Sequence, residues 1–180
     1  MIKYMLDGDL MNLIVLSGKA GSGKDTVASL LKSKLTGRTI LLSYAHYLKM
    51  YAKNVVGWDG SEETKPRTFL QDVGDLVKEI DHNFLINRVV QDIEVYKHYF
   101  DNIIITDARF KDEIEIMKQK YNATIIRING DHNNLNETQR RHNTETSLDN
   151  YTDYDYVIFN NGTMRELENK VDVVMEEFKW

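Results

Sequence analysis

Cysteine is absent from this chain of 180 residues, and proline occurs once, at Pro66. The absence of cysteine excludes a disulfide framework and thiol chemistry, and it suits a protein of the cytoplasm. No apolar run approaches the length of a membrane span, and the first ten residues carry Asp7 and Asp9 where a signal peptide would have its apolar centre. We therefore expect a cytoplasmic protein with no membrane partner, in which residues 1–10 are an N-terminal extension.

Positive charge is also scarce, because 23 Lys and Arg residues stand against 28 Asp and Glu residues and leave a net charge of −5. An extended basic face for long nucleic acid is therefore not expected, although a local basic pocket for nucleotide phosphates is compatible with an acidic surface. Apolar residues make up 42% of the chain and charged residues 28%, which is typical of a globular protein. The length predicts a single domain over residues 1–180.

Strand-like and helix-like segments alternate along the chain, without internal repeats or low-complexity tracts. Short apolar runs rich in branched residues predict five buried parallel strands: Leu13–Ser17, Thr39–Ser43, Ile103–Thr106, Thr124–Ile128 and Tyr156–Phe159. Apolar residues at helical spacing predict a helix containing Val27, Leu30, Leu31 and Leu35, and further helices at Tyr47–Val56, Thr68–Ile80, Asn83–Tyr99, Lys111–Tyr121 and Thr163–Phe178. This alternation predicts a three-layer, doubly wound α/β domain with a parallel five-stranded sheet and ligands at the carboxyl ends of the strands.

A glycine-rich turn, Gly18-Lys-Ala-Gly-Ser-Gly-Lys-Asp-Thr26, follows the first predicted strand. Backbone N–H groups in such a turn point inward, the following helix adds its positive N-terminal end, and glycines permit close approach to phosphates. The context of strand, turn and helix predicts an ATP-binding P-loop in which Lys24 reaches the terminal phosphates. The expected ATP-binding residues are Gly18, Ala20, Gly21, Ser22, Gly23, Lys24, Asp25 and Thr26. The alternative is an ordinary glycine-rich turn between a strand and a helix.

Two carboxylates are candidates for a magnesium environment. Asp25 stands where a P-loop usually has Ser or Thr, and it can bind Mg²⁺ directly, bind it through water, or cap the helix start. Asp107 follows the apolar run Asn102–Thr106, where a strand places an Asp beside the phosphate loop to hold Mg²⁺ through water. Alternatively, Asp107 caps the helix that begins near Phe110. Arg109 follows at the same strand end, where it can bind the phosphate of the donor or the acceptor.

The segment from 129 to 154 is strongly polar, rich in Asn, Asp, Thr and His, and carries Arg140 and Arg141. Polar residues placed between two core strands predict a lid that closes over phosphates and delivers the two arginines. The alternative is a long surface excursion whose arginines are solvated. Long loops in compact domains are usually functional, which favours the lid.

Arg67 and Gln71 lie four residues apart and therefore share one face of a predicted helix. Arg67 can pair with a phosphate while Gln71 reads a base edge, although an exposed helix face without function gives the same spacing. His142-Asn-Thr-Glu145, directly after the two arginines, can fix the geometry of the lid by hydrogen bonding. The histidines are scattered and cysteine is absent, so no zinc site is expected, and we find no Ser–His–Asp arrangement.

Further segments are similar to a set of family motifs. They are Ser43-Tyr-Ala-His-Tyr-Leu-Lys49 (similar to FADPLK), Arg67–Gly74 (LQxxG), Thr106-Asp-Ala-Arg-Phe110 with Glu113 (DVRFxxE), His142–Glu145 (HxSE) and Asn160-Asn-Gly-Thr163 (NDGT). With the glycine-rich turn, they resemble the deoxynucleoside monophosphate kinases of bacteriophage and bacterial type, within the P-loop nucleoside monophosphate kinases. The resemblance spans nearly the whole chain and implies a P-loop kinase fold with a lid segment. The departures lie on the acceptor side, where His46 and Tyr47 replace an Asp-Pro pair and Asp75 follows Gly74.

The resemblance implies a role for each candidate residue. The catalytic residues would be Lys24, Arg109, Arg140 and Arg141, which handle phosphates, together with Asp107. Asp25 and Asp107 would form the magnesium environment, and Asn161 and Gly162 would lie near the adenine of ATP. The acceptor nucleotide would be bound by Lys49, Arg67, Gln71, His142 and Glu145.

The reaction that we expect is ATP- and Mg²⁺-dependent phosphoryl transfer to a (deoxy)nucleoside monophosphate, which gives the diphosphate. A monophosphate is mostly dianionic at pH 7, because its second pKa is about 6, and it attacks without a catalytic base. A hydroxyl acceptor would gain from a carboxylate near the end of the second strand, but that strand ends Leu42-Ser-Tyr-Ala-His46. In an unusual geometry, Asp107 or Asp25 could serve as the base instead.

Two alternatives to this reaction stay open. The first is a kinase of the same fold that phosphorylates a hydroxyl of a modified base in DNA, of a nucleoside or of dephospho-coenzyme A. The second is a non-catalytic nucleotide-binding protein. The sequence also leaves open whether the chain forms a homodimer.

Overall fold

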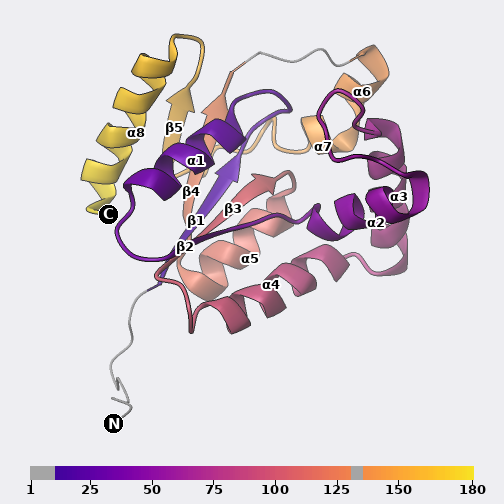
Figure 1. Ribbon diagram of the computed structural model, residues 1–180, viewed down its shortest axis with the longest axis horizontal. Coiled ribbons are helices and arrows are strands. Elements are labelled where there is room, and N and C mark those ends of the chain that lie inside the picture. The colour runs from indigo at the N-terminus through magenta and orange to yellow at the C-terminus, as the bar shows by residue number, and fades with distance from the viewer. Residues whose placement is uncertain (1–10, 131–135) are drawn as a thin grey trace.

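The structure, a computed structural model, describes residues 11–130 and 136–180. Figure 1 shows a central sheet with helices on both faces and a group of helices beyond the carboxyl ends of the strands. The N-terminal extension expected over residues 1–10 lies outside the described residues, as do residues 131–135 of the predicted lid. No helix in the described part of the chain is long and apolar enough to cross a membrane.

Five parallel strands form the sheet in the order β2-β3-β1-β4-β5. Their bounds are Asn12–Ser17 (β1), Thr39–Leu42 (β2), Asn102–Ala108 (β3), Thr124–Asn129 (β4) and Tyr156–Phe159 (β5). β1 is the central strand, where Val15 pairs with Ile105 of β3 and with Ile125 of β4. The predicted parallel, doubly wound sheet is therefore confirmed. The turn after β1 opens at the carboxyl edge of the sheet, between the ends of its two neighbours.

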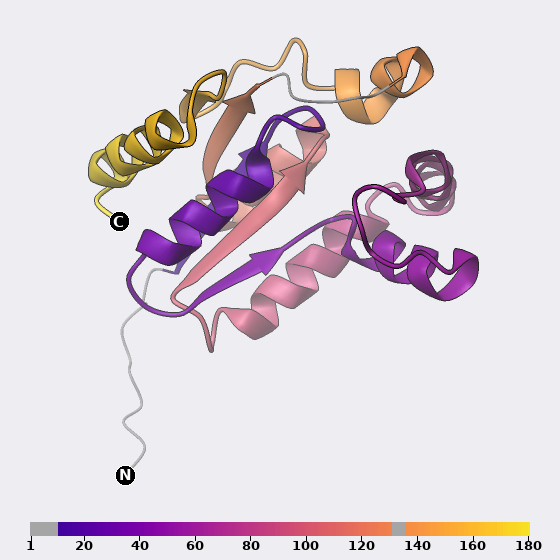
Figure 2. The ribbon, with the colours of Figure 1, turned by 45° about the horizontal axis from the view of Figure 1, so that its top comes forward.

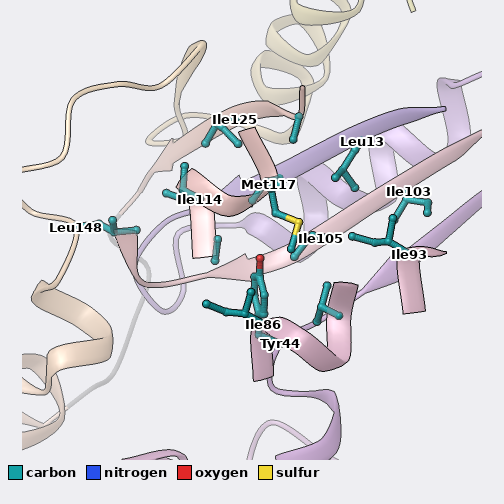
Figure 3. Packing of buried hydrophobic residues seen from close by; sticks show 14 residues of the cluster. Leu13, Tyr44, Ile86, Ile93, Ile103, Ile105, Ile114, Met117, Ile125 and Leu148 are labelled. Atoms are coloured by element: carbon teal, nitrogen blue, oxygen red, sulfur yellow. The ribbon is translucent and has the colours of Figure 1, made fainter. Parts of the chain in front are cut away.

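Each face of the sheet carries its own apolar core, because successive side chains of a strand point to opposite faces. In β3, Ile103 and Ile105 belong to one core and Ile104 to the other, and all three are fully buried. Figure 3 shows the first core, in which Ile93 and Met117 pack against strand residues. Continuous burial on both faces explains the unbroken apolar runs of β1 and β3. The edge strands β2 and β5 are partly exposed, so the prediction that all five strands are buried is wrong for these two.

Helices cover both faces of the sheet and form the outer layers (Figure 2). The first face is covered by α4 (Phe84–Tyr96) and α5 (Lys111–Tyr121), and the second by α1 (Lys24–Lys34) and α8 (Met164–Phe178). The predicted bounds hold within one or two residues, except that α4 ends at Tyr96 and not at Tyr99. The chain turns over residues 97–100, where the Phe100 N–H donates to the carbonyl oxygen of Tyr96, and then enters β3.

Four more helices lie beyond the carboxyl ends of the strands. They are α2 (His46–Val56), which packs on α3 (Arg67–Ile80), and the short helices α6 (Glu137–Arg141) and α7 (Asn143–Thr146). No helix was predicted where α6 and α7 lie. Reciprocal capping explains α6, because the Asn136 side chain accepts from the Gln139 N–H (2.9 Å) and the Gln139 side chain accepts from the Asn136 N–H (3.3 Å).

Candidate active site

The glycine-rich turn between β1 and α1 is shaped by close contacts that only glycine permits. Gly23, which precedes α1, has a φ of 95° in the left-handed region, and a Cβ there would collide with the side-chain amide of Asn160. A Cβ on Gly18 would lie 2.5 Å from the Ser22 hydroxyl and 2.6 Å from the carbonyl oxygen of Ile128. The turn therefore folds tightly over the end of the sheet, and its shape depends on these glycines.

Lys24 lies buried beneath this turn. Its Nζ donates to the carbonyl oxygens of Gly18 (2.8 Å) and Lys19 (2.7 Å). Burial, together with the positive charge of Arg109, lowers the pKa of the Lys24 ammonium to about 7. A bound phosphate would replace the two carbonyl oxygens as the acceptor and would favour the charged form of Lys24.

Two further observations indicate that the turn can bind a chain of phosphates. The Ser22 hydroxyl is buried and has no hydrogen-bond partner among the described residues, so a phosphate oxygen would satisfy it. The first N–H groups of α1, which begins at Lys24, have no acceptor within the helix, and the positive end of the helix points to the same place. A triphosphate supplies acceptors for all these donors.

Asp107, at the carboxyl end of β3, clamps the turn between β2 and α2. Its carboxylate accepts from the Ser43 hydroxyl (2.6 Å) and from the N–H groups of Tyr44 (2.8 Å) and Ala45 (3.1 Å). Asp107 therefore does not cap the helix after β3, and that alternative prediction is wrong. Asp107 also lines a cleft together with Lys24 and Asp25, and Asp25 is exposed at the start of α1.

Glu113 takes the capping role at α5. Its Oε2 accepts from the N–H groups of Arg109 (2.7 Å) and Phe110 (3.0 Å), and it fixes the turn from which Arg109 extends. Glu113 is 3% exposed, and burial raises its pKa to about 7, although the two hydrogen bonds act to lower the pKa. From the sequence, Glu113 is part of a family motif, and no role was predicted for it.

Replacing Glu113 by Gln is expected to stabilise the protein at alkaline pH. Because the folded-state pKa is raised, the folded protein binds more protons than the unfolded chain between pH 4.5 and about 7, and wild-type stability falls as pH rises through this window. The amide keeps an acceptor for the two N–H groups and carries no charge. We expect the free energy of unfolding of Glu113→Gln to exceed that of the wild type by about 1–3 kcal/mol at pH 8 and to equal it near pH 4.5.

Denaturant unfolding of both proteins at the two pH values measures this difference. Glu79→Gln, which changes an exposed carboxylate on α3, is the control and should have little effect at either pH. A Glu113→Gln variant that loses the same stability at both pH values would show that the carboxylate is ionised and needed as such.

Three separate segments meet at the Arg109 guanidinium. Its Nη1 donates to Oε1 of Glu145 (2.5 Å) and to the carbonyl oxygen of Thr144 (3.3 Å). The other carboxylate oxygen of Glu145 accepts from the Ala20 N–H of the glycine-rich turn (2.8 Å). The predicted residues Arg109, Glu145 and Ala20 are thus brought together by β3, α7 and the turn after β1.

The acceptor-side candidates line the same continuous cleft. Lys49 of α2 and Arg67 and Gln71 of α3 face it together with Lys24 and Arg109. The lining also includes the apolar side chains of Leu48, Leu70, Leu85 and Phe110, together with Lys78 and Glu113. This combination of cationic and apolar side chains suits a nucleotide, because its phosphates are anionic and its base is flat with apolar faces.

Some of these candidates also contact other residues. Arg67 pairs with Glu62, and the Gln71 side-chain amide donates to the Thr144 hydroxyl (3.5 Å). His142 connects α7 to α3, because its Nε2 lies 3.1 Å from a carboxylate oxygen of Asp75. His142 is outside the lining of the cleft.

Besides His142, four predicted residues lie outside the lining of the cleft and are exposed. Arg140 and Arg141 are exposed on α6, and Arg141 pairs with Glu137 on the same helix. Asn161 and Gly162 are exposed in the turn between β5 and α8. Their neighbour Asn160, which was not predicted, contacts the glycine-rich turn directly through a hydrogen bond from its amide to the Ser22 carbonyl oxygen (3.0 Å).

Comparison with known proteins supports a kinase fold. Shikimate kinase from Bacteroides thetaiotaomicron superposes with a TM-score of 0.53 at 16% identity, and the match covers 94% of this chain and 99% of that one. Dephospho-CoA kinase from Campylobacter jejuni superposes with a TM-score of 0.55 at 12% identity, covering 93% and 96%. Such low identities indicate the fold alone, and they confirm the predicted P-loop kinase architecture.

Sequence comparison also relates the chain to a protein family. The uncharacterized protein ORF77 of Ictalurid herpesvirus 1 (strain Auburn) is 28% identical over 163 residues, which is 90% of this chain and 69% of the relative. The family model of deoxynucleotide monophosphate kinase matches residues 38–171. That match includes the acceptor side of the cleft, Arg109 and the α6–α7 segment, and it begins after the glycine-rich turn. Because it spans most of the sequence, the chain belongs to the deoxynucleotide monophosphate kinase family.

Proposed function

We propose that the protein transfers the terminal phosphoryl group of ATP to a nucleoside or deoxynucleoside monophosphate and gives the diphosphate, with Mg²⁺ as cofactor. One observation carries the proposal: a single cleft is lined both by Gly21, Lys24 and Asp25 of the glycine-rich turn and by Arg67 and Gln71 of α3. A kinase must hold its donor and its acceptor in one water-excluding space, and this cleft provides a place for each.

The donor end of the cleft supplies binding and charge. The N–H groups of the glycine-rich turn and Lys24 would hold the phosphates of ATP, and Arg109 would offset the negative charge on the transferred group. Asn161 and Gly162 would approach the adenine from the turn after β5. Arg140 and Arg141 are exposed on α6, so their proposed part in catalysis requires α6 to move toward the cleft.

Mg²⁺ is usually held by one or two carboxylates, water and substrate phosphates. Asp25 and Asp107 fit this pattern, because both carboxylates line the cleft beside Lys24. Among the described residues, no group of three or more acidic, His or Cys side chains could hold a metal without such phosphates. The ion would supply positive charge that screens the phosphates from the incoming anion.

The choice of a phosphate acceptor is supported by the surroundings of Asp107. A hydroxyl acceptor would gain from a carboxylate that takes its proton, and Asp107 is the carboxylate at the end of the strands beside Lys24. Its oxygens already accept three hydrogen bonds from the turn after β2, which leaves about one of its four lone-pair sites, and water bound to Mg²⁺ would take that site. A monophosphate needs cationic partners and no base, and Lys49, Lys65 and Arg67 line the cleft.

The expected product separates this proposal from its rivals. Purified protein, incubated with Mg-ATP and a panel of ribo- and deoxyribonucleoside monophosphates, should give ADP and a new phosphoanhydride, which phosphorus NMR identifies. A new phosphomonoester with nucleosides or other hydroxyl acceptors would instead identify a hydroxyl kinase. ATP binding with no product from any acceptor would identify a non-catalytic nucleotide-binding protein.

A further inference from the structure

A buried carboxylate lies at the mouth of the glycine-rich turn. Glu145 has a side chain that is 7% exposed, and it bonds through one oxygen to the Ala20 N–H (2.8 Å) and through the other to Arg109 (2.5 Å). Ala20 belongs to the phosphate-binding turn, and Arg109 is the cation at the neighbouring strand end. Both partners are donors that the proposed function assigns to phosphate oxygens.

The chemistry of Glu145 resembles that of the ligand expected at this position. A carboxylate is an anion that offers only acceptor oxygens, as a phosphate does, and Arg109 pairs well with either group. Burial lowers the pKa of the Lys24 ammonium, and Glu145 lies close enough for its negative charge to oppose that lowering. The Glu145 carboxylate and a phosphate cannot both accept from the Ala20 N–H and Arg109, because two anions so close together repel strongly in a buried site.

The attachment of Glu145 allows it to move. It lies on α7, a helix of four residues that is joined to α6 through His142. α7 contacts α3 through the His142 ring and Asp75 (3.1 Å) and through Thr144 and Gln71 (3.5 Å). The first firm anchor after α7 is Leu148, which is buried in the core. Release of Glu145 would therefore free a short segment that can turn about Leu148.

We propose that Glu145 is a displaceable occupant of the phosphate site: it holds the Ala20 N–H and Arg109 in the nucleotide-free protein, and the terminal phosphate of ATP takes its place. This inference rests on the proposed function and gives Glu145 a role other than binding the acceptor. Its displacement would free α7, and with it α6, which carries Arg140 and Arg141. Donor binding would thus be coupled to the movement that these arginines need to reach the cleft.

Removal of the competing charge should tighten phosphate binding. The variant Glu145→Gln keeps the shape of the side chain and one acceptor oxygen but carries no charge. We expect the Kd for ATP, and for inorganic tripolyphosphate as a probe of the phosphate part alone, to fall at least about tenfold, as expected for the loss of one charge-assisted competitor. Isothermal titration calorimetry measures both constants, and a thermal melt of each protein confirms that it is folded.

Asp149→Asn is the matched control. Asp149 is a half-exposed carboxylate that pairs with Lys19 of the same turn (2.8 Å). Removing its charge should change either Kd less than about threefold. Glu145→Asp, which keeps the charge on a shorter side chain, should give an intermediate gain in affinity. It also serves as the readout if Glu145→Gln does not fold.

The outcomes separate the two proposals. Unchanged or weaker ATP and tripolyphosphate binding by Glu145→Gln and Glu145→Asp, with binding by the wild type intact, would overturn the role of Glu145 and leave the proposed function standing. An equal gain in affinity from Asp149→Asn would also overturn it, because the effect would then be one of general charge. Failure of the wild-type protein to bind ATP would overturn the proposed function itself.

Discussion

Replacing Lys24 by alanine is expected to lower kcat for phosphoryl transfer by about 10²- to 10³-fold or more, since one preorganised charged donor at the reacting phosphate is lost. Lys24 is buried beneath the turn after β1, and its only described hydrogen-bond acceptors are two carbonyl oxygens of that turn. The fold should survive, because the buried ammonium is costly to desolvate and its pKa is already lowered. Steady-state kinetics and a thermal melt of the variant measure the two effects.

Lys34→Ala is the control for Lys24→Ala. Lys34 lies on the same helix and pairs with Asp172 at the surface, far from the cleft. Its removal should leave kcat within about twofold of the wild-type value, because exposed ion pairs contribute little. If Lys24→Ala also keeps kcat within threefold, the glycine-rich turn does not hold the transferred phosphate.

Replacing Arg109 by alanine is expected to lower kcat by about 10²-fold and to destabilise the protein. Activity falls because a guanidinium that lines the cleft together with Lys24 is lost. Stability falls because the Glu145 carboxylate, which is nearly buried, loses its cation, and an unpaired buried charge costs about 3–5 kcal/mol. Kinetics and denaturant unfolding of the variant report the two losses separately.

The double variant Arg109→Ala with Glu145→Gln distinguishes catalysis from folding. Neutralising Glu145 removes the unpaired charge, so the double variant should regain most of the lost stability and none of the lost kcat. Arg38→Ala, which removes an exposed arginine paired with Asp101 away from the cleft, should alter neither quantity by a measurable amount. A double variant that regained activity together with stability would show that Arg109 has a structural role only.

The fold could be predicted from the sequence because its segments differ sharply in hydrophobic pattern. The strand Tyr156–Phe159 and the helix Lys111–Tyr121 have the predicted bounds, since polar residues flank each apolar pattern. The helix α6 was missed although Asn136 and Gln139 have the spacing of a capping box. The polar composition around them indicated a loop, and local capping overrode that composition.

The residues around the glycine-rich turn could also be predicted from the sequence, because parallel strands bring their carboxyl ends to one edge of the sheet. Lys24, Asp107 and Arg109 therefore converge as the strand order requires. The role of Glu113 was hidden because the helix it caps begins after Phe110, which lacks the Ser, Thr, Asp or Asn that marks a capping box. The contact between Glu145 and Ala20 joins residues 125 positions apart, and no local pattern encodes it.

The predicted lid illustrates the same limit. Composition identified the segment, but the direction in which Arg140 and Arg141 point depends on how α6 and α7 pack against α3. In the structure His142 and Thr144 make those contacts, and the two arginines are exposed. Their delivery to the cleft remains a prediction about the nucleotide-bound state.

The most direct test of the central claim is a crystal structure with a bisubstrate analogue in which adenosine and a deoxynucleoside are joined through five phosphates. We predict that the phosphates next to adenosine lie on the N–H groups of the glycine-rich turn and that Lys24 Nζ leaves the carbonyl oxygens of Gly18 and Lys19 for phosphate oxygens. The deoxynucleoside should lie between Arg67 and Phe110. Phosphates bound elsewhere, with Lys24 still bonded to its own turn, would contradict the account.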